Sequence, residues 1–182
     1  MLIRDEHGCR LAPGVNLESI ALPDNAQGVV RSRIDRLPPQ LQLTLKVASV
    51  IGRSFSTKLL KEILPFESER SNLLEYLEKL EERGLLERRD SNAEEWMFKN
   101  QVTVEVAYNL MLFSQRRQLH HQIAEWFEEQ SIGRINSVLP LLAYHWGKAQ
   151  QPAREIFWLQ KAGEQALRTG ACQEAIAQLT RV

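Results

Sequence analysis

The fold is decided by residues 84–98, which read Gly-Leu-Leu-Glu-Arg-Arg-Asp-Ser-Asn-Ala-Glu-Glu-Trp-Met-Phe. The turn-forming residues Asp90, Ser91 and Asn92 separate two short segments, Leu-Leu-Glu-Arg-Arg and Glu-Glu-Trp-Met-Phe. This pattern predicts two short strands around a tight loop. Because the chain on either side has helical periodicity, the position of this hairpin among the helices determines the fold class.

Upstream of the hairpin, apolar residues recur every three or four positions, which predicts a series of helices. The first helix begins near Ala26 and ends at Pro38-Pro39, and this proline pair can start the second helix. The second helix has a wide apolar face and ends at Gly52, where we expect a left-handed C-terminal cap. The residues of that face are Leu41, Leu45, Val47, Ala48 and Ile51.

Two further helices precede the hairpin. Ser56 or Thr57 can cap a short helix that runs through Leu64, and Pro65 ends it. Ser68 can cap the next helix, which ends at Gly84. Its apolar stripe consists of Leu73, Leu77 and Leu80. Three helices followed by a hairpin is the order of a winged helix, so we predict a mainly α fold with a winged-helix module over residues 26–113.

Residues 114–182 are predicted to form helical hairpins that resemble tetratricopeptide (TPR) repeats. The last stretch matches the roughly 34-residue TPR pattern at its small residues, since Ala162-Gly163 fits the first helix, Gly170 the turn and Ala175 the second helix. Leu179 fits the large apolar position of that second helix. The sequence ends before the proline that usually closes a repeat, so we expect a truncated TPR-like region. An ordinary alanine-rich helix pair is the alternative.

Composition sets limits on the function. Lysine plus arginine number 23 and so do aspartate plus glutamate, so no overall charge favours nucleic acid or an anionic membrane. Cys9 and Cys172 lie far apart without metal-ligand spacing, which indicates free thiols in a reducing compartment. Residues 1–25 have many turn-forming residues and suggest irregular chain with one strand at most, serving as a connecting segment. No signal peptide or membrane span is expected, and we predict a cytoplasmic protein.

The sequence offers no catalytic constellation. It contains neither a Gly-x-x-x-x-Gly-Lys-Ser/Thr nor a Gly-x-Gly-x-x-Gly motif, so we expect no nucleotide hydrolysis, no cofactor and no metal in this chain. His120 and His121 point about 100° apart on a helix and cannot grip one metal together. His145 has no carboxylate nearby in sequence and is interpreted as packed or solvated. Glu78, Glu81 and Glu82 are interpreted as a solvated helix face.

A winged helix can bind DNA through the helix before its wing, but the charge of that helix is unfavourable. Over residues 67–83, six glutamates face three basic residues, and this balance repels phosphate groups. We therefore expect no DNA contact by this helix. The pairs Arg88-Arg89 and Arg116-Arg117 are candidates to meet an acidic partner.

Four stretches together resemble a known family. They read Gly-Val-Val-Arg-Ser-Arg-Ile-Asp-Arg-Leu-Pro (28–38), Leu-Lys-Val-Ala-Ser-Val-Ile-Gly-Arg-Ser-Phe (45–55), Met-Phe-Lys-Asn-Gln-Val-Thr-Val-Glu-Val-Ala-Tyr-Asn-Leu-Met (97–111) and Arg-Arg-Gln-Leu-His-His-Gln-Ile-Ala (116–124). In this order they resemble the region after the ATPase core of STAND-type signalling ATPases found downstream of class III adenylate or guanylate cyclase domains. The resemblance implies an AAA-like ATPase domain before residues 1–25, with ATP or ADP and Mg²⁺ held there, and TPR-like repeats after the winged helix.

The resemblance also marks one position for nucleotide sensing. The segment that matches residues 97–100 usually reads Phe-x-His in the family, whereas this chain has Phe98-Lys99-Asn100. Asn100 can donate a hydrogen bond to phosphate but carries no imidazolium charge, and Lys99 is a candidate to supply charge instead. The alternative is structural, with Phe98 packed under the wing and Asn100 capping the next helix.

These observations predict a non-catalytic regulatory fragment of a multidomain signalling ATPase or nucleotide cyclase. It would couple nucleotide state to an output domain or partner through contacts with the ATPase domain, the output domain and a protein partner on the helical repeats. Two alternatives remain at this stage. One is part of a transcriptional regulator with a DNA-binding winged helix or output domain, and the other is a free-standing helical-repeat scaffold.

Overall fold

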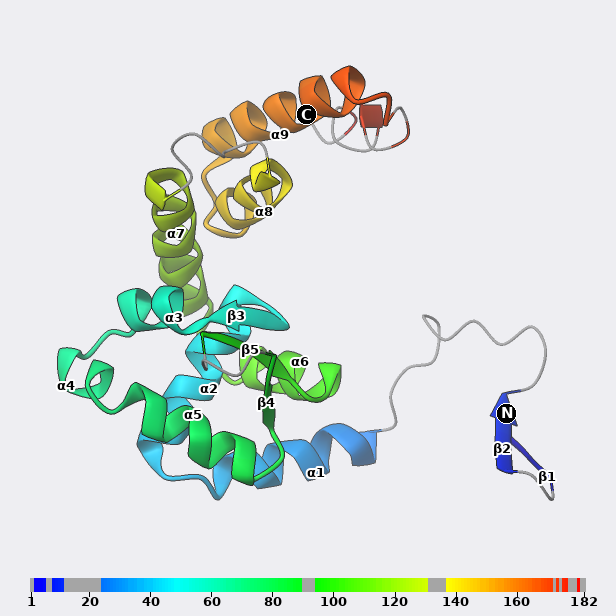
Figure 1. Ribbon diagram of the computed structural model, residues 1–182, viewed down its shortest axis with the longest axis vertical. Coiled ribbons are helices and arrows are strands. Elements are labelled where there is room, and N and C mark those ends of the chain that lie inside the picture. The colour runs from blue at the N-terminus through cyan, green and yellow to red at the C-terminus, as the bar shows by residue number, and fades with distance from the viewer. Residues whose placement is uncertain are drawn as a thin grey trace.

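The protein is mainly helical and has a small three-stranded sheet in its lower half (Figure 1). The computed structural model describes residues 2–5, 8–11, 24–89, 94–130, 137–171, 173, 175, 176 and 180, with side chains from residue 26 onward. Because most of the described residues are helical, the prediction of a mainly α fold is confirmed. None of the helices in the described ranges is long and apolar enough to span a membrane.

The N-terminal segment differs from the prediction of one strand at most. Strands β1 (Leu2–Asp5) and β2 (Gly8–Leu11) pair antiparallel, with Leu2 opposite Leu11 and Asp5 opposite Gly8. Two strands of four residues are too short to show a clear alternation of side chains, which is why the sequence did not reveal the pair.

Helix α1 (Asp24–Asp35) leads into α2 (Pro39–Ile51), and Pro39 is at the start of α2 as predicted. A proline fits there because its missing amide hydrogen would have no partner in the first turn. Gly52 has a positive φ of 141°, but its ψ of −166° is extended and does not form the expected left-handed cap. The chain passes directly from this glycine to a strand, and only glycine adopts this backbone conformation without strain.

Strand β3 (Ser54–Ser56) was not predicted, and it precedes α3 (Thr57–Ile63). The side chain of Ser56 caps α3 by accepting a hydrogen bond from the amide of Leu59 at 3.2 Å. A strand of three residues is below the length at which alternation can be recognised.

The predicted helix beginning at Ser68 is wrong in one respect, because two helices occupy this stretch. Helix α4 (Glu67–Arg70) contains Ser68, and α5 (Leu73–Glu82) follows as a separate element. Arg70 donates hydrogen bonds to the carbonyls of Glu62 and Leu64, and these bonds connect the short helix α4 to the end of α3. The longer helix ends at Glu82, and Gly84 follows it with a φ of +68°.

The hairpin prediction is confirmed by β4 (Leu86–Arg88) and β5 (Glu95–Phe98), which pair antiparallel. The sheet order is β3-β5-β4, so β5 lies in the middle. Trp96 pairs with Phe55 on one side and with Arg88 on the other. The predicted turn at Asp90, Ser91 and Asn92 lies outside the described residues.

One large apolar core joins the sheet to α1, α2, α3, α5 and α6 (Gln101–Asn109). Its largest members include Trp96 and Phe98, both fully buried on the central strand. Their rings approach the core because alternate residues of a strand point to the same face. The ring of Phe98 meets that of Phe55 edge to face at a centroid distance of 5.8 Å.

The C-terminal part consists of α7 (Phe113–Gln130), α8 (Leu139–Lys148) and α9 (Pro152–Arg168), which form the upper half of Figure 1. A second, smaller apolar core lies between these helices. Ala162 and Gly163 are buried on α9, and Gly170 follows it with a φ of +77°. Ala175 is also buried, whereas Leu179 lies outside the described residues.

Candidate functional site

Three polar side chains connect the two halves of the molecule. The hydroxyl of Tyr108 on α6 lies 3.0 Å from Nε2 of His120 on α7. Nδ1 of His120 in turn lies 2.8 Å from Nδ1 of His145 on α8. We call this chain of Tyr108, His120 and His145 the junction relay. It spans three helices and reaches both apolar cores.

The junction relay is buried and electrically neutral at ordinary pH. Both histidines are fully buried. Burial, together with the nearby charges of Lys148 and Arg116, lowers the pKa of His120 to about 4. Burial also lowers the pKa of His145 to about 3, with a contribution from His120. The pair therefore favours the uncharged state, because burial removes the water that would stabilise an imidazolium.

The tautomers of the two histidines are linked. Only one of the two Nδ1 atoms carries the proton of the hydrogen bond between His120 and His145. Because a neutral histidine has one protonated and one unprotonated ring nitrogen, the direction of this bond fixes the direction of the bond between His120 and Tyr108. Nε2 of His145 is buried without a partner in the described part of the chain. If His145 donates through Nδ1, this Nε2 is a bare lone pair, which costs less than a buried N–H without an acceptor. We assign the proton to Nδ1 of His145, so that His120 donates through Nε2 to Tyr108.

Aromatic rings enclose the junction relay. Phe127 stacks beside His145 at 6.2 Å, and Tyr144 meets the rings of His120 and His145 edge to face. The Arg116 guanidinium lies 4.6 Å over the ring of Tyr108. These contacts fix the relay in one geometry and keep water away from it.

A second polar cluster holds the C-terminal helices together. Oε1 of Glu128 on α7 accepts hydrogen bonds from the indole of Trp146 at 2.7 Å and from that of Trp158 at 2.9 Å. Arg154 donates to both oxygens of the same carboxylate, at 3.0 and 2.8 Å. One carboxylate therefore connects α7, α8 and α9, and we call this cluster the Glu128 hub. Charge-assisted hydrogen bonds of this kind are stronger than neutral ones.

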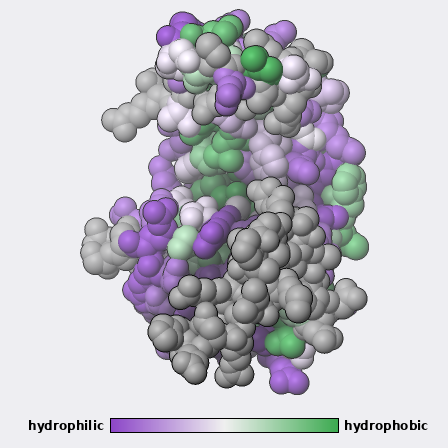
Figure 2. Space-filling model, turned by 90° about the vertical axis from the view of Figure 1, so that its right-hand side faces the viewer, coloured by the Kyte–Doolittle hydropathy of each residue, from purple (hydrophilic) through white to green (hydrophobic). Residues whose placement is uncertain are grey.

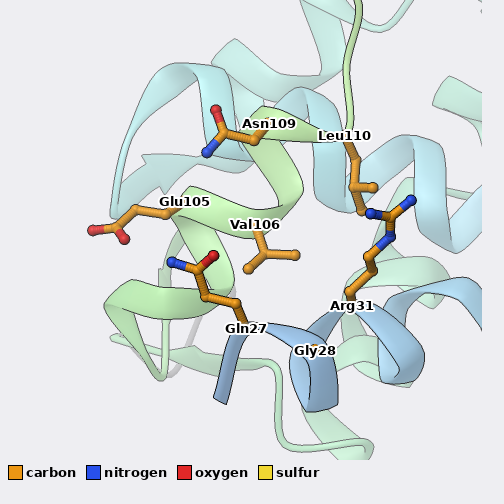
Figure 3. A pocket seen from close by; sticks show the side chains of 7 residues that line it. All are labelled: Gln27, Gly28, Arg31, Glu105, Val106, Asn109 and Leu110. Carbon is orange, nitrogen blue, oxygen red and sulfur yellow. The ribbon is translucent and has the colours of Figure 1, made fainter. Parts of the chain in front are cut away.

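Two cavities lie along α6, and the larger one reaches Tyr108 of the junction relay. The larger one has a volume of about 450 Å³ and is lined by the end of α2, by α6 and by Tyr144. The smaller one, of about 280 Å³, lies between α1 and α6, where Arg31 and Glu105 reach toward its rim from opposite elements (Figure 3). Glu105 and Asn109 line both cavities, and we call the two cavities together the recess along α6. Figure 2 shows hydrophobic side chains exposed on the viewed side, between the upper and lower parts of the molecule.

The predicted sensor residues lie on the loop between β5 and α6. Oδ1 of Asn100 accepts a hydrogen bond from the amide of Val102 at 2.9 Å and caps α6. Phe98 is fully buried beside it, which is the structural alternative that the sequence offered. Lys99 and Asn100 are both exposed. Their role in nucleotide sensing stays a prediction.

The two arginine pairs proposed for an acidic partner are largely engaged within the chain. The side chain of Arg88 contacts Glu81 at 2.8 Å and Glu78 at 3.3 Å, and it lies over the ring of Trp96. Strand β4 places Arg88 against α5, and contact of the arginine pairs with an acidic partner stays a prediction. Arg116 bonds to Asn109, and Arg117 bonds to Gln150. Glu78 and Glu81 are accordingly a pairing surface for the wing as well as a solvated helix face.

Sequence reasoning treated His120 and His145 separately and missed that they meet. The usable signal was the helical phase, because His120 shares a face of α7 with Ile123, Ala124 and Phe127. No comparable signal pairs it with a residue on another helix. Among the residues that the structure describes, no group of three or more His, Cys, Asp or Glu side chains could hold a metal ion.

This chain is similar in sequence to adenylate cyclase type 10 from two mammals. The chain is 24% identical over 179 residues to adenylate cyclase type 10 from Rattus norvegicus, which covers 92% of this chain and 11% of the rat protein. It is 35% identical over 60 residues to adenylate cyclase type 10 from Oryctolagus cuniculus, which covers 33% of this chain and 4% of the rabbit protein. The chain thus spans a small part of these relatives. No family model and no solved structure matches.

Proposed function

We propose that this chain is a non-catalytic coupling module of a larger signalling protein, built from a winged-helix unit and TPR-like helical hairpins. The similarity to adenylate cyclase type 10 over 92% of the chain supports a cyclase context, as does the resemblance to STAND-type ATPases. In this proposal the parent protein is a signalling ATPase or nucleotide cyclase. The chain passes the nucleotide state of an ATPase domain, which holds ATP or ADP and Mg²⁺, to an output domain.

The order of elements over residues 39–98 supports the winged-helix part of the proposal. Helices α2, α3 and α5 precede the β4–β5 hairpin, and β3 adds a third strand beside β5. The acidic side chains of α5 repel phosphate groups, which disfavours DNA as its ligand. In addition, Glu78 and Glu81 pair with the wing arginine Arg88, so this arginine is not free to contact a DNA phosphate. A protein surface is the partner that this unit fits better.

The buried residues of α9 and of the segment after it support the TPR-like part of the proposal. Trp158 is buried one turn before Ala162-Gly163, and Ala175 is buried after the turn at Gly170. Large and small residues at this spacing suit the first and second helices of such a repeat. We propose that a protein partner binds this surface, in the cytoplasm.

The junction relay is the observation that carries the coupling proposal. Tyr108 lies on the helix that begins at the predicted sensor residue Asn100, and His145 lies on the first helix of the C-terminal pair. In this proposal a movement of α6 reaches α8 through two hydrogen bonds. Coupling of this kind requires an element with two arrangements, and the Tyr108–His120 hydrogen bond, formed or broken, is the element that we propose.

The multidomain part of the proposal is tested by the native gene product. An antibody raised against this chain would recover it from its own cells for mass determination and peptide mapping. We expect a product much longer than 182 residues, with peptides that contain a phosphate-binding loop and an output domain. A product of the size of this chain would contradict the proposal and favour a free-standing scaffold.

The DNA-binding alternative is tested separately. Fluorescence anisotropy with a labelled duplex at two salt concentrations would measure binding by the purified chain. We expect no salt-sensitive association, because α5 is acidic and the chain has no net charge. Salt-sensitive binding that is lost in Arg89→Ala would favour the transcriptional reading.

A further inference from the structure

Three arginines line a pocket where α1, the following turn and the end of α5 meet. The pocket has a volume of about 290 Å³ and is lined by Arg33, Arg36, Leu37, Arg83 and Leu85. Leu37 and Leu85 are buried and form an apolar floor. We call this site the arginine pocket. It lies away from the recess along α6, and no residue is shared between them.

One arginine of the pocket is held in place by the backbone. Nη2 of Arg33 donates a hydrogen bond to the carbonyl of Arg83 at 2.7 Å. This bond joins α1 to the end of α5 and fixes one guanidinium at the rim. A guanidinium fixed in this way loses less side-chain entropy when it binds a ligand.

The charges of the pocket have no counter-ion in the described part of the chain. Other arginines do meet carboxylates there, since Arg31 pairs with Asp35, Arg88 with Glu81 and Arg154 with Glu128. Arg33, Arg36 and Arg83 form no ion pair with any described residue, and Glu82 does not line the pocket. Three like charges around one small space repel each other until an anion enters.

A simpler explanation is that the arginines balance the negative ends of two helices. The C-terminal ends of α1 and α5 both lie here, and each helix end carries roughly half a negative charge. Two such ends offset about one of the three positive charges. A surplus of about two charges remains, which is more than helix ends account for.

We propose that the arginine pocket binds the multiply charged phosphate group of a small molecule. Arginine forks match phosphate oxygens in two-point hydrogen bonds, and the three exposed guanidinium groups are accessible to such a ligand. A single carboxylate would balance only one of the charges. The compact pocket also suits one tetrahedral or linked pair of phosphate groups better than an extended acidic peptide. This proposal does not depend on the coupling proposal.

The test is a calorimetric titration of the purified 182-residue chain with inorganic pyrophosphate, in metal-free buffer at constant ionic strength. We expect one pyrophosphate per chain, with weaker binding at higher salt. Arg36→Ala and Arg83→Ala should each weaken binding by about tenfold or more. Truncating Arg83 keeps the backbone carbonyl that holds Arg33, so both variants should retain the melting temperature of the parent chain.

Arg31→Ala is the matched control, because Arg31 lies on the same helix but outside the arginine pocket. It should change pyrophosphate affinity by about twofold at most. Parallel titrations with a nucleoside triphosphate would distinguish the sources of phosphate, since equal affinity indicates recognition of phosphate alone and tighter binding indicates an added nucleoside contact. The proposal is overturned by the absence of saturable binding, by equal weakening in Arg31→Ala, or by an acidic peptide that binds as tightly as pyrophosphate.

Discussion

The two halves of the molecule are held together by different forces. Helices α1 to α6 and the sheet surround one large apolar core in which Trp96 and Phe98 are fully buried. Helices α8 and α9 have a smaller core, and two polar clusters connect them to α7. Apolar burial is non-directional, whereas hydrogen bonds demand a particular geometry. The first half is thus built for stability and the second for a defined orientation.

Helix α7 belongs to both halves of the molecule. Leu119 and Ile123 join the large core, while Ala124 joins the small one. His120 and Glu128, on the same helix, carry the junction relay and the Glu128 hub. The comparison therefore predicts that substitutions in the first core lower the stability of the whole molecule by a large amount. Smaller effects confined to α7, α8 and α9 are expected for changes in the polar clusters.

The largest effect is expected from Trp96→Ala. Removing this fully buried ring leaves a cavity at the centre of the sheet and should lower the free energy of unfolding by about 3–5 kcal/mol. Urea denaturation followed by circular dichroism would measure it. Leu74→Ala is the control, because Leu74 is 48% exposed on α5 and should cost less than about 1 kcal/mol. Equal losses in both variants would contradict the assignment of the first core.

Acidification should weaken the second half next. The histidine pKa values are lowered from 6.5 to about 4 and about 3 in the folded chain, so the unfolded chain binds more protons between these values and pH 6.5. The stabilisation is complete above pH 6.5 and is lost as pH falls toward 3. From pH 7 to pH 5 we expect a loss of about 3 kcal/mol for the two groups together.

Urea denaturation at several pH values would measure this loss in the parent chain and in His145→Gln. His145→Gln removes one titrating group and should reduce the pH slope. A parent chain whose stability does not change between pH 7 and pH 5 would refute the buried neutral pair.

Glu128→Ala should have a more local effect. Two buried indole N–H groups and Arg154 would lose their acceptor, which should cost about 2 kcal/mol in the α8–α9 region. Hydrogen exchange should increase in α8 and α9 while α2 keeps its protection. Glu129→Ala is the control, because Glu129 is exposed at the neighbouring position. Loss of protection throughout α2 would mean that the halves are not separable in this way.

Tyr108→Phe is expected to have the smallest effect on stability, about 1 kcal/mol, because it removes only the hydroxyl that contacts His120. Its effect on communication should be larger than this cost suggests, because it cuts the relay between α6 and α7. Tyr144→Phe is the matched control on α8, since no hydrogen bond of the Tyr144 hydroxyl is found within the described residues. A double-mutant cycle with His145→Gln should show coupling for Tyr108 and none for Tyr144.

The sequence predicted those features that depend on local patterns. The proline start of α2, the Ser56 cap and the hairpin around residues 86–98 follow from neighbouring residues alone. Positive φ at Gly52 was foreseen for the same reason, although the strand after Gly52 gives it an extended ψ. Strand β3 and the β1–β2 pair were missed, since strands this short exist only through their partners.

The polar clusters were missed for a related physical reason. His120 and His145 are 25 positions apart, and the packing of α7 on α8 decides whether they meet. The pairing of Arg88 with Glu78 and Glu81 likewise depends on how β4 lies along α5. The phase of a helix predicts which face is buried but not which residue of another helix it contacts.

The most direct test of the coupling proposal is hydrogen exchange of the intact gene product with and without bound nucleotide, in the parent sequence and in Tyr108→Phe. We predict that nucleotide changes protection over residues 85–105 in both proteins. The change should extend to α8 and α9 in the parent sequence and stop before them in Tyr108→Phe. Equal protection of residues 85–105 in the two nucleotide states would contradict the account, and so would transmission to α9 that survives in Tyr108→Phe.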